Sequence, residues 1–225
     1  MTYMSEYQDE EFDKKSFEEE AKAISQSVLE KHLVARKFDE NNTKKWGDLI
    51  IDEIHKTLSD KYPQHGYLIF FYMSNKTPFL SNYSTVSYLE TDIKVFAHYY
   101  TDDFNSEIML LAIRKVGILD HSFDFVKNKE LLSEIYKKTS GHLVGRIYKQ
   151  DTFDIVLDSI NKDISEILLP EHYAPITLYN IYVNKLPIKG IYFYYKFFNL
   201  ELQPLFFKYH NDTFICRVFL FLITY

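Results

Sequence analysis

The sequence has few of the residues that define secreted, fibrous or disordered proteins. It contains one cysteine, Cys216, in 225 residues, which excludes a framework of disulfide bonds and is typical of a reducing compartment. Six glycines and six prolines exclude the collagen-like and proline-rich disordered classes. The N-terminal segment is acidic and polar and lacks an apolar core, so we expect no signal peptide.

Long apolar runs and an excess of positive charge are also missing. The longest apolar stretch, Phe214–Thr224, is interrupted by Arg217 and is too short to span a bilayer as a helix. The formal net charge is −6, with −8 on residues 1–112 and +2 on residues 113–225. Because no basic stripe is present, we expect neither a nucleic acid nor a membrane as partner.

Apolar and aromatic residues, by contrast, are abundant and regularly spaced. Hydrophobic residues make up 46% of the chain, with 19 Tyr and 19 Phe, which is enough for packed cores. From Trp46 to Leu58 apolar residues recur at three- and four-residue steps, which predicts an amphipathic helix. The run Gly66–Met73 is short and rich in aromatic residues, which predicts a central strand.

The same pattern occurs twice, 110 residues apart and without a gap. The segment HLVAR at His32–Arg36 aligns with HLVGR at His142–Arg146. Apolar positions align at the same offset: Trp46 with Val156, Ile50 with Ile160, Ile54 with Ile164, Leu58 with Leu168, Leu68 with Leu178, Phe71 with Ile181, Tyr72 with Tyr182, Met73 with Val183, Phe104 with Phe214 and Ile108 with Val218. The constant offset predicts a tandem duplication.

The duplication divides the chain into an acidic disordered tail (1–15), a first domain (16–116), a junction (117–128) and a second domain (129–225). Each domain is predicted to hold two helices followed by four strands. The expected fold class is therefore α+β, with two helices packed on a four-stranded antiparallel sheet in each unit.

Local signals place the elements within each domain. Asp39–Asn42 and Asp151 are expected to cap the second helix of each domain, which Pro63 and Pro170 end, and Gly141 is expected to weaken the helix before Asp151. The expected strands are residues 66–73, 79–90, 93–99 and 108–113 in the first domain and 178–184, 191–198, 202–209 and 213–224 in the second.

No motif of a known catalytic site occurs, neither a glycine-rich phosphate-binding loop nor an HExxH or GxSxG sequence. Asp120, His121 and Asp124 could bind a hard metal ion or act as acid and base, but they lie in the predicted junction, where a solvated linker is the preferred interpretation. A buried inert thiol is preferred to a nucleophile for Cys216. We therefore expect no enzyme, no catalytic residue, no metal site and no cofactor.

Two further features have alternative interpretations. His32 and His142 recur at equivalent positions, where a structural role at a helix end is preferred to a pH switch. The aromatic run Tyr192–Phe198 could stack nucleobases, but without a basic surface a packed or exchanged strand is preferred.

The spacing of these elements resembles that of the Tctex-type dynein light chains. In that family an aromatic residue precedes a Trp by eight positions, a Leu follows that Trp by twelve, and a strand of the type K-Y-I-V-T comes about eight residues later. Here Phe38, Trp46, Leu58 and Gly66–Phe70 take those places, and Tyr88–Glu90 takes the place of the family's F-W-D. In the second half, Val156 stands where the Trp is expected, and its F-W-D place reads F-N-L.

Tctex-type light chains are usually dimers in which each partner lends its second strand to the other's sheet. The resemblance implies that Phe79–Glu90 and Ile191–Phe198 are such exchanged arms, and that one chain forms an internal pseudo-dimer rather than a homodimer. The residues expected in the exchanged strands are Phe79, Val86, Tyr88, Ile191, Phe193 and Phe197.

The resemblance also implies a binding edge on the third strand of each half, at Ile93–Tyr100 and Leu202–Tyr209. An unpaired edge offers backbone donors and acceptors to an extended peptide, although a protected edge is the alternative. Pro204 suits an edge because it has no N–H. The expected binding residues are Ile93, Val95, Phe96, Ala97, His98, Leu205, Phe206, Phe207 and Lys208.

The expected function is that of a non-catalytic dynein light-chain-type subunit, which scaffolds or tethers a dynein or axonemal assembly by binding segments of larger chains. The resemblance implies the dynein intermediate chain, or another dynein or axonemal subunit, as the partner. The expected location is the cytoplasm and cytoskeleton, with the ciliary axoneme as a second setting. The alternative is an adaptor of the same fold outside any motor complex, linking cargo or signalling partners.

Overall fold

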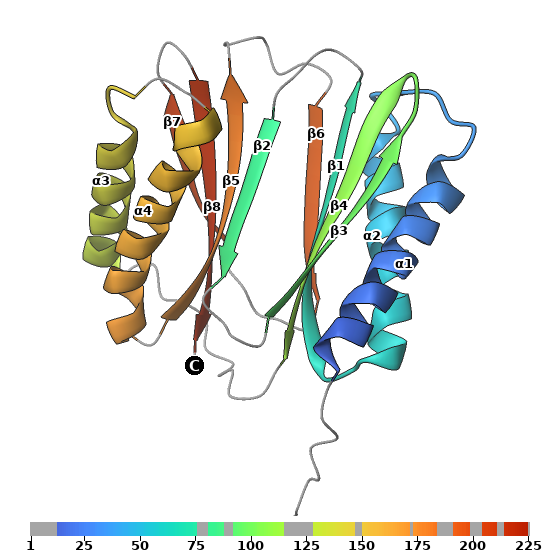
Figure 1. The fold of residues 1–225 in the computed structure, drawn as a ribbon, viewed down its shortest axis with the longest axis horizontal. Helices are drawn as coiled ribbons and strands as arrows, with labels where there is room; N and C mark the ends of the chain where they lie inside the picture. The colour runs from blue at the N-terminus through green and yellow to red at the C-terminus, as the bar shows by residue number, and fades with distance from the viewer. Residues whose placement is uncertain are drawn as a thin grey trace, which may run out of the picture.

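The computed structural model describes residues 13–75, 81–87, 92–114, 128–146, 150–171, 173–183, 191–198, 204–210 and 214–224. These residues form four α-helices, one 3₁₀ helix and eight strands. Figure 1 shows them in four layers, with a pair of helices on each outer side and two sheets between them. The predicted α+β class, with helices packed on antiparallel four-stranded sheets, is confirmed.

Each half of the chain contributes two helices and then four strands. In the first half these are α1 (Lys14–Leu33), α2 (Thr43–Lys61), β1 (His65–Asn75), β2 (Ser81–Ser87), β3 (Asp92–Tyr100) and β4 (Phe104–Arg114). In the second half they are α3 (Lys129–Leu143), α4 (Gln150–Leu168), the 3₁₀ helix η1 (Leu169–Glu171), β5 (Tyr173–Val183), β6 (Ile191–Phe198), β7 (Pro204–His210) and β8 (Phe214–Thr224).

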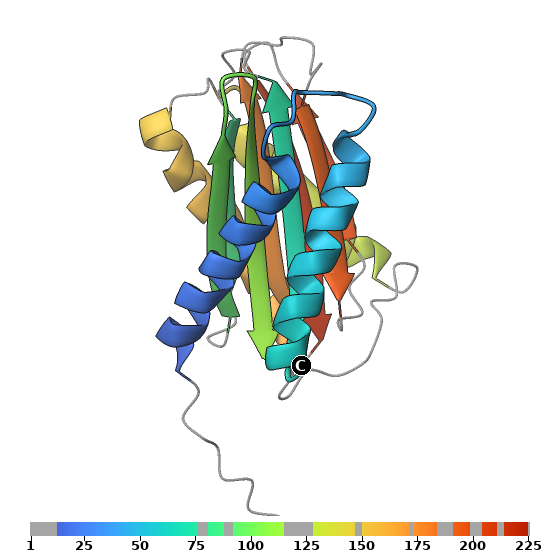
Figure 2. The same cartoon turned by 90° about the vertical axis from the view of Figure 1, so that its right-hand side faces the viewer.

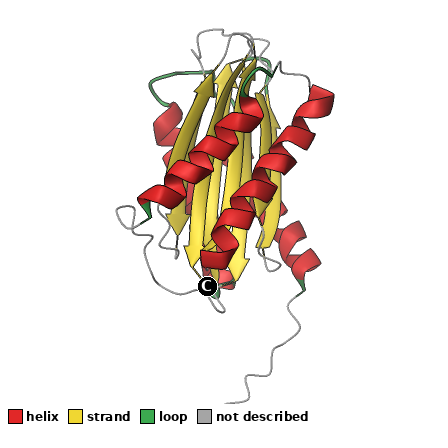
Figure 3. Cartoon of the chain, turned by 90° about the vertical axis from the view of Figure 1, so that its left-hand side faces the viewer, coloured by secondary structure: helices red, strands yellow, loops and turns green. Residues whose placement is uncertain are grey.

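The helices bury the apolar faces that their sequences predict. Figure 2 shows α1 and α2 lying over one face of the first sheet, and Figure 3 shows α3 and α4 over the second. The buried helix positions at the 110-residue offset are Trp46, Ile50, Ile54 and Leu58 in α2 and Val156, Ile160, Ile164 and Leu168 in α4. Burial of each such side chain contributes about 1.5–3 kcal/mol, so these faces hold the helices on the sheets.

The carboxylate of Asp13 caps the start of α1 by accepting from the N–H groups of Lys15 and Ser16 at 3.1 and 3.0 Å. Helix α1 therefore begins at Lys14, before the predicted domain boundary between residues 15 and 16.

The first helix of each half ends in the same way. After the helices, Ala35 and Gly145 take positive φ angles of 58° and 69°, a conformation that reverses the chain at a helix C-terminus.

The two sheets each take one strand from the other half. The first sheet has the order β3-β4-β1-β6 and the second the order β2-β5-β8-β7. All pairs are antiparallel, with Phe71 of β1 opposite Tyr194 of β6 and Tyr179 of β5 opposite Ser84 of β2. The second strand of each half therefore completes the sheet of the other half.

Strand β1 is buried on both faces because it lies between a helix layer and the second sheet. Ile69 and Phe71 belong to the core under α1 and α2. Their neighbours Leu68 and Phe70 point to the opposite face and are also buried, and the second sheet lies on this side of the first (Figure 1). The continuous apolar run in the sequence is explained by this burial on both sides.

The expectation of one constant offset without a gap is wrong for β5. In the first sheet Phe71 pairs with Ile108. The offset aligns these two residues with Ile181 and Val218, but in the second sheet Val218 pairs with Tyr179 instead. Strand β5 starts at Tyr173, two residues earlier than the offset places it. A shift of two residues leaves every side chain on the same face, so the hydrophobic pattern did not reveal it.

Two local predictions at the helices are also corrected. Asn42 precedes α2 but its side chain caps no N–H group; instead its amide donates to the carboxylate of Asp39 at 2.5 Å. Asp151 lies inside α4, which begins one residue earlier at Gln150. Helix α3 includes Gly141 in its last turn and ends at Leu143, and no atom crowds the glycine.

Candidate functional site

Strand β3 lies at an edge of the first sheet and pairs only with β4 among the described strands. Ile93, Val95 and Ala97 are buried and belong to the core under α1 and α2. They fix the strand in place, and they are not available to a partner's side chains. Of the β3 residues expected to bind, these three can contribute only through their backbone groups.

The opposite face of β3 carries its accessible side chains. Phe96 is 37% exposed and Tyr100 is 66% exposed. The ring of His98 stacks on that of Tyr100, with centroids 5.8 Å apart and planes 9° from parallel. This edge therefore combines open backbone groups with a short row of exposed aromatic rings.

A carboxylate lies beside this row, on β4. Glu107 is directly opposite His98 in the strand register, and its Oε2 lies 3.7 Å from Nδ1 of His98, which is too long for a hydrogen bond. Burial raises the pKa of Glu107 to about 7. Burial also lowers the pKa of His98, with a smaller contribution from Lys22. Both shifts favour the neutral forms.

Strand β7 is the corresponding edge of the second sheet and pairs only with β8 among the described strands. Leu205 is buried and Phe207 packs against the second core, where its ring lies 5.8 Å from that of Tyr136. Phe206 is 51% exposed and Lys208 is exposed. The two predicted edges thus lie in different sheets and differ in chemistry, because β7 carries a lysine where β3 has His98.

The residues expected in exchanged strands fall into two groups. Ile191, Phe193 and Phe197 lie in β6, which pairs with β1, and Val86 lies in β2, opposite Thr177 of β5. Phe79 and Tyr88 lie outside the described residues. Sequence reasoning did not anticipate that β6 and β2 would themselves form the second edge of each sheet.

Sequence reasoning also missed the polar contacts that hold β6 to helix α2. Lys196 of β6 donates to both carboxylate oxygens of Asp52, at 2.9 and 3.0 Å, and lies 3.1 Å from Asp48. The hydroxyl of Tyr194 is 3.0 Å from that of Thr43. A lysine within an aromatic strand, and two aspartates four residues apart on a helix, were the available signals.

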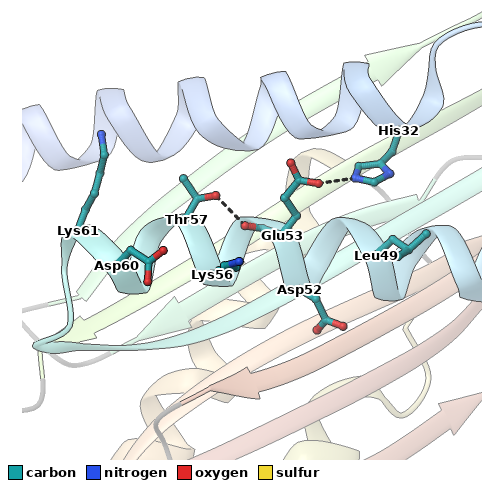
Figure 4. Close-up of a pocket in the computed structure, with 8 residues that line it drawn as sticks. All are labelled: His32, Leu49, Asp52, Glu53, Lys56, Thr57, Asp60 and Lys61. Atoms are coloured by element: carbon teal, nitrogen blue, oxygen red, sulfur yellow. Dashed lines mark hydrogen bonds and ion pairs between the residues drawn. The ribbon is translucent and has the colours of Figure 1, made fainter.

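A hollow of about 670 Å³ on the outer surface of the first helix pair is a second candidate. Figure 4 shows Glu53 and His32 pointing toward each other across it, with Nε2 of His32 2.7 Å from Glu53. Lys31 donates to the same carboxylate at 2.6 Å. The pKa of Glu53 is lowered by its hydrogen bonds to Lys31 and then to His32. The charge of the carboxylate is thus already compensated by its neighbours. This favours a structural role, in which these contacts hold α1 to α2, over the binding of a ligand.

Other chemistry finds little support in the described residues. Cys216 is buried, and burial raises its pKa to about 12, so the reactive thiolate is scarce at neutral pH. Within the described ranges no three His, Cys, Asp or Glu residues are grouped as metal ligands. Asp120, His121 and Asp124 lie outside those ranges. Of the described helices, none is both long and apolar enough to cross a membrane.

No protein-family model matches the sequence, and no curated protein matches it.

Proposed function

We propose that the chain is a non-catalytic scaffold protein of the Tctex light-chain type, which binds extended segments of larger chains along β3 and β7. The observation that carries this proposal is the strand order, in which each sheet ends in a strand with a paired neighbour on one side only among the described strands. Such an edge can accept an added strand through backbone hydrogen bonds, while neighbouring side chains select the sequence.

The Tctex type is supported by the arrangement of each half. Two helices precede four antiparallel strands, and the second strand of each half lies in the other half's sheet. This is the arrangement that the resemblance in Phe38, Trp46 and Leu58 implies. Within this proposal the exchanged strands make one chain the equivalent of a dimer.

A tandem duplication is supported by polar contacts that recur 110 residues apart. The His32–Glu53 pair at 2.7 Å corresponds to His142–Asp163 at 2.9 Å. Nε of Arg36 donates to the carbonyl of His32, and Nε of Arg146 donates to that of His142. The acidic partners Glu53 and Asp163 were not among the residues from which the duplication was inferred, so their equivalent contacts are independent support.

The two edges would bind different segments because their side chains differ. The β3 edge offers Phe96, His98 and Tyr100 near Glu107, whereas the β7 edge offers Phe206 and Lys208. We therefore place the chain in a dynein or axonemal assembly as a subunit that joins two segments of larger chains, the dynein intermediate chain first among them. An adaptor outside a motor complex would use the same edges with other partners.

Affinity purification of the tagged chain from its own cells, followed by mass spectrometry, tests this function. Along an edge strand, the N–H groups of adjacent residues point alternately toward the paired strand and toward the open side of the strand. Of the two single variants Phe96→Pro and Ala97→Pro, one therefore removes a donor on the open side and leaves the β3–β4 hydrogen bonds intact. Phe206→Pro and Phe207→Pro are the matching variants of β7, and circular dichroism identifies those that fold.

We expect dynein chains to accompany the wild type, and folded proline variants to lose them. If no dynein or tubulin chain is recovered but other proteins depend on the edges, the adaptor function replaces the motor function. Retention of all partners by every folded proline variant would contradict binding along β3 and β7.

A further inference from the structure

Helix α2 contacts the exchanged strand β6 through residues that differ in type from those at the equivalent positions of the other half. Tyr194 and Phe198 of β6 pack against the first core. The ring of Phe198 lies flat on that of His55, with centroids 3.7 Å apart and planes 8° from parallel. The exchange can therefore be compared with its counterpart, β2 under α4, position by position.

The first difference is one of size. A Cβ atom added to Gly47 of α2 would lie 3.0 Å from the ring of Tyr194, so the large side chain of β6 needs the glycine. In the other half the positions are reversed: Leu157 of α4 is buried, and the residue opposite Tyr179 in the exchanged strand is Ser84. In one half a small helix residue thus contacts a large strand residue, whereas at the equivalent sequence positions of the other half the helix residue is large and the strand residue is small.

The second difference is one of charge. Lys196 of β6 is held by Asp48 and Asp52 of α2. Burial by itself lowers the pKa of Lys196, but its hydrogen bonds to Asp52 and Asp48 outweigh burial and the pKa is raised. At the corresponding positions α4 has Asp158 and Lys162, and β2 has Val86 opposite Thr177. The lysine is therefore matched to the first half alone.

We infer that these differences form a specificity device, which makes β6 dock under α2 and excludes pairing of like halves. If β6 returned to its own half, Tyr194 would meet Leu157, and Lys196 would face one aspartate and one lysine, Asp158 and Lys162, in place of two aspartates. If β2 docked under α2, Ser84 would leave a cavity beside Gly47, and Asp48 and Asp52 would lose their cation.

The consequence concerns assembly with a second copy of this chain. Two identical first halves, or two identical second halves, would have to combine mismatched residues at this contact, which raises the free energy of a symmetric pair. Unlike halves combine matched residues, and within one chain they meet at a high effective concentration. The specificity device therefore favours pairing between the two halves of one chain. This pairing does not depend on what β3 and β7 bind.

Charge reversal at the latch (Lys196 with Asp48 and Asp52) tests this inference in the full-length chain. The substitution K196E places a carboxylate against two aspartates of α2, whereas in α4 it would face one aspartate, Asp158, and one lysine, Lys162. We expect K196E to lower the Tm by roughly 3–8 °C and to give concentration-dependent dimers in sedimentation velocity. The triple variant K196E/D48K/D52K restores the opposite charges, and we expect it to return to a single species of the monomer mass, 26.9 kDa.

Lys56→Glu is the matched control, because it makes the same charge change at an exposed position of α2 and should leave the monomer unchanged. A K196E protein that stays monomeric at every concentration would overturn the inference. If K196E is insoluble, the triple variant still decides: recovery of a soluble monomer supports the latch, and failure to recover it contradicts the latch.

Discussion

Gly47 lies where helix α2 meets both β1 and the exchanged strand β6. A Cβ atom at this position would lie 2.8 Å from the ring of Phe71 and 3.0 Å from the ring of Tyr194. Both rings are packed, so neither can move away without disturbing the core. Gly141, which is exposed in the last turn of α3, has no atom within 4 Å of such a Cβ.

The two glycines should therefore respond to alanine in opposite directions. An alanine gains about 1 kcal/mol of helix propensity over glycine, but overpacking costs about 1–3 kcal/mol. We expect Gly47→Ala to lower the free energy of unfolding by about 1 kcal/mol and Gly141→Ala to raise it by a similar amount. Urea unfolding of the two variants checks this, and a stabilised Gly47→Ala would contradict the close packing of α2 on β6.

Glu107 makes stability depend on pH. Its pKa is raised to about 7 by burial, so the folded protein holds a proton that the unfolded chain releases between about pH 4.5 and 7. Stability is therefore fully present below this window and falls as the pH rises through it. The size of the shift corresponds to about 3 kcal/mol.

The variant Glu107→Gln removes this ionisation and should flatten the pH dependence. We expect it to match the wild type near pH 4.5 and to be more stable at pH 8, by up to about 3 kcal/mol. Urea unfolding at the two pH values is the measurement. An equal loss of stability from pH 4.5 to 8 in both proteins would show that other groups cause the dependence.

At the scale of elements, the two halves end their first helices in one geometry with different residues. The N–H groups of Val34 and Val144 donate to carbonyls four residues earlier, at 2.9 and 3.0 Å. The next residue takes a positive φ in both, but it is Ala35 in one half and Gly145 in the other. An L-residue pays about 1–2 kcal/mol for this conformation, and glycine does not.

Exchange of these residues should change stability in a predictable direction. We expect Ala35→Gly to stabilise the protein by about 0.5–1 kcal/mol and Gly145→Ala to destabilise it by about 1 kcal/mol, because the strain at positive φ outweighs the opposite change in the entropy of the unfolded chain. Thermal unfolding of the pair tests this. A destabilised Ala35→Gly would indicate that α1 ends in some other conformation.

The elements also show what the sequence could and could not predict. Periodicity placed the helices and most strands, because the buried faces of α2 and α4 repeat at helical spacing. The register of β5 was out of reach, since a shift of two residues keeps the same side chains buried. The contact of Lys196 with Asp48 and Asp52 was also out of reach, because nothing local links residues so far apart in the chain.

On the scale of the whole molecule, the strand exchange positions every proposed site. It places β6 and β2 at one edge of each sheet and leaves β3 and β7 at the other. The helices and the exchange of the second strands followed from the sequence and from the resemblance, but the candidate binding edges followed only in part. Ile93, Val95 and Ala97 were predicted as binding residues although their alternation with less apolar neighbours already indicated a half-buried strand, and the core under α1 and α2 covers their side chains.

Disulfide trapping tests the exchange most directly. Met73 of β1 and Tyr192 of β6 are opposite each other in the register, and Cys216 is buried and slow to compete. We expect the full-length variant Met73→Cys/Tyr192→Cys to form its disulfide within one chain on mild oxidation, with a monomer band on a non-reducing gel and the cross-linked peptides in mass spectrometry. A chain that forms no such disulfide, or forms it only between two chains, would contradict the account.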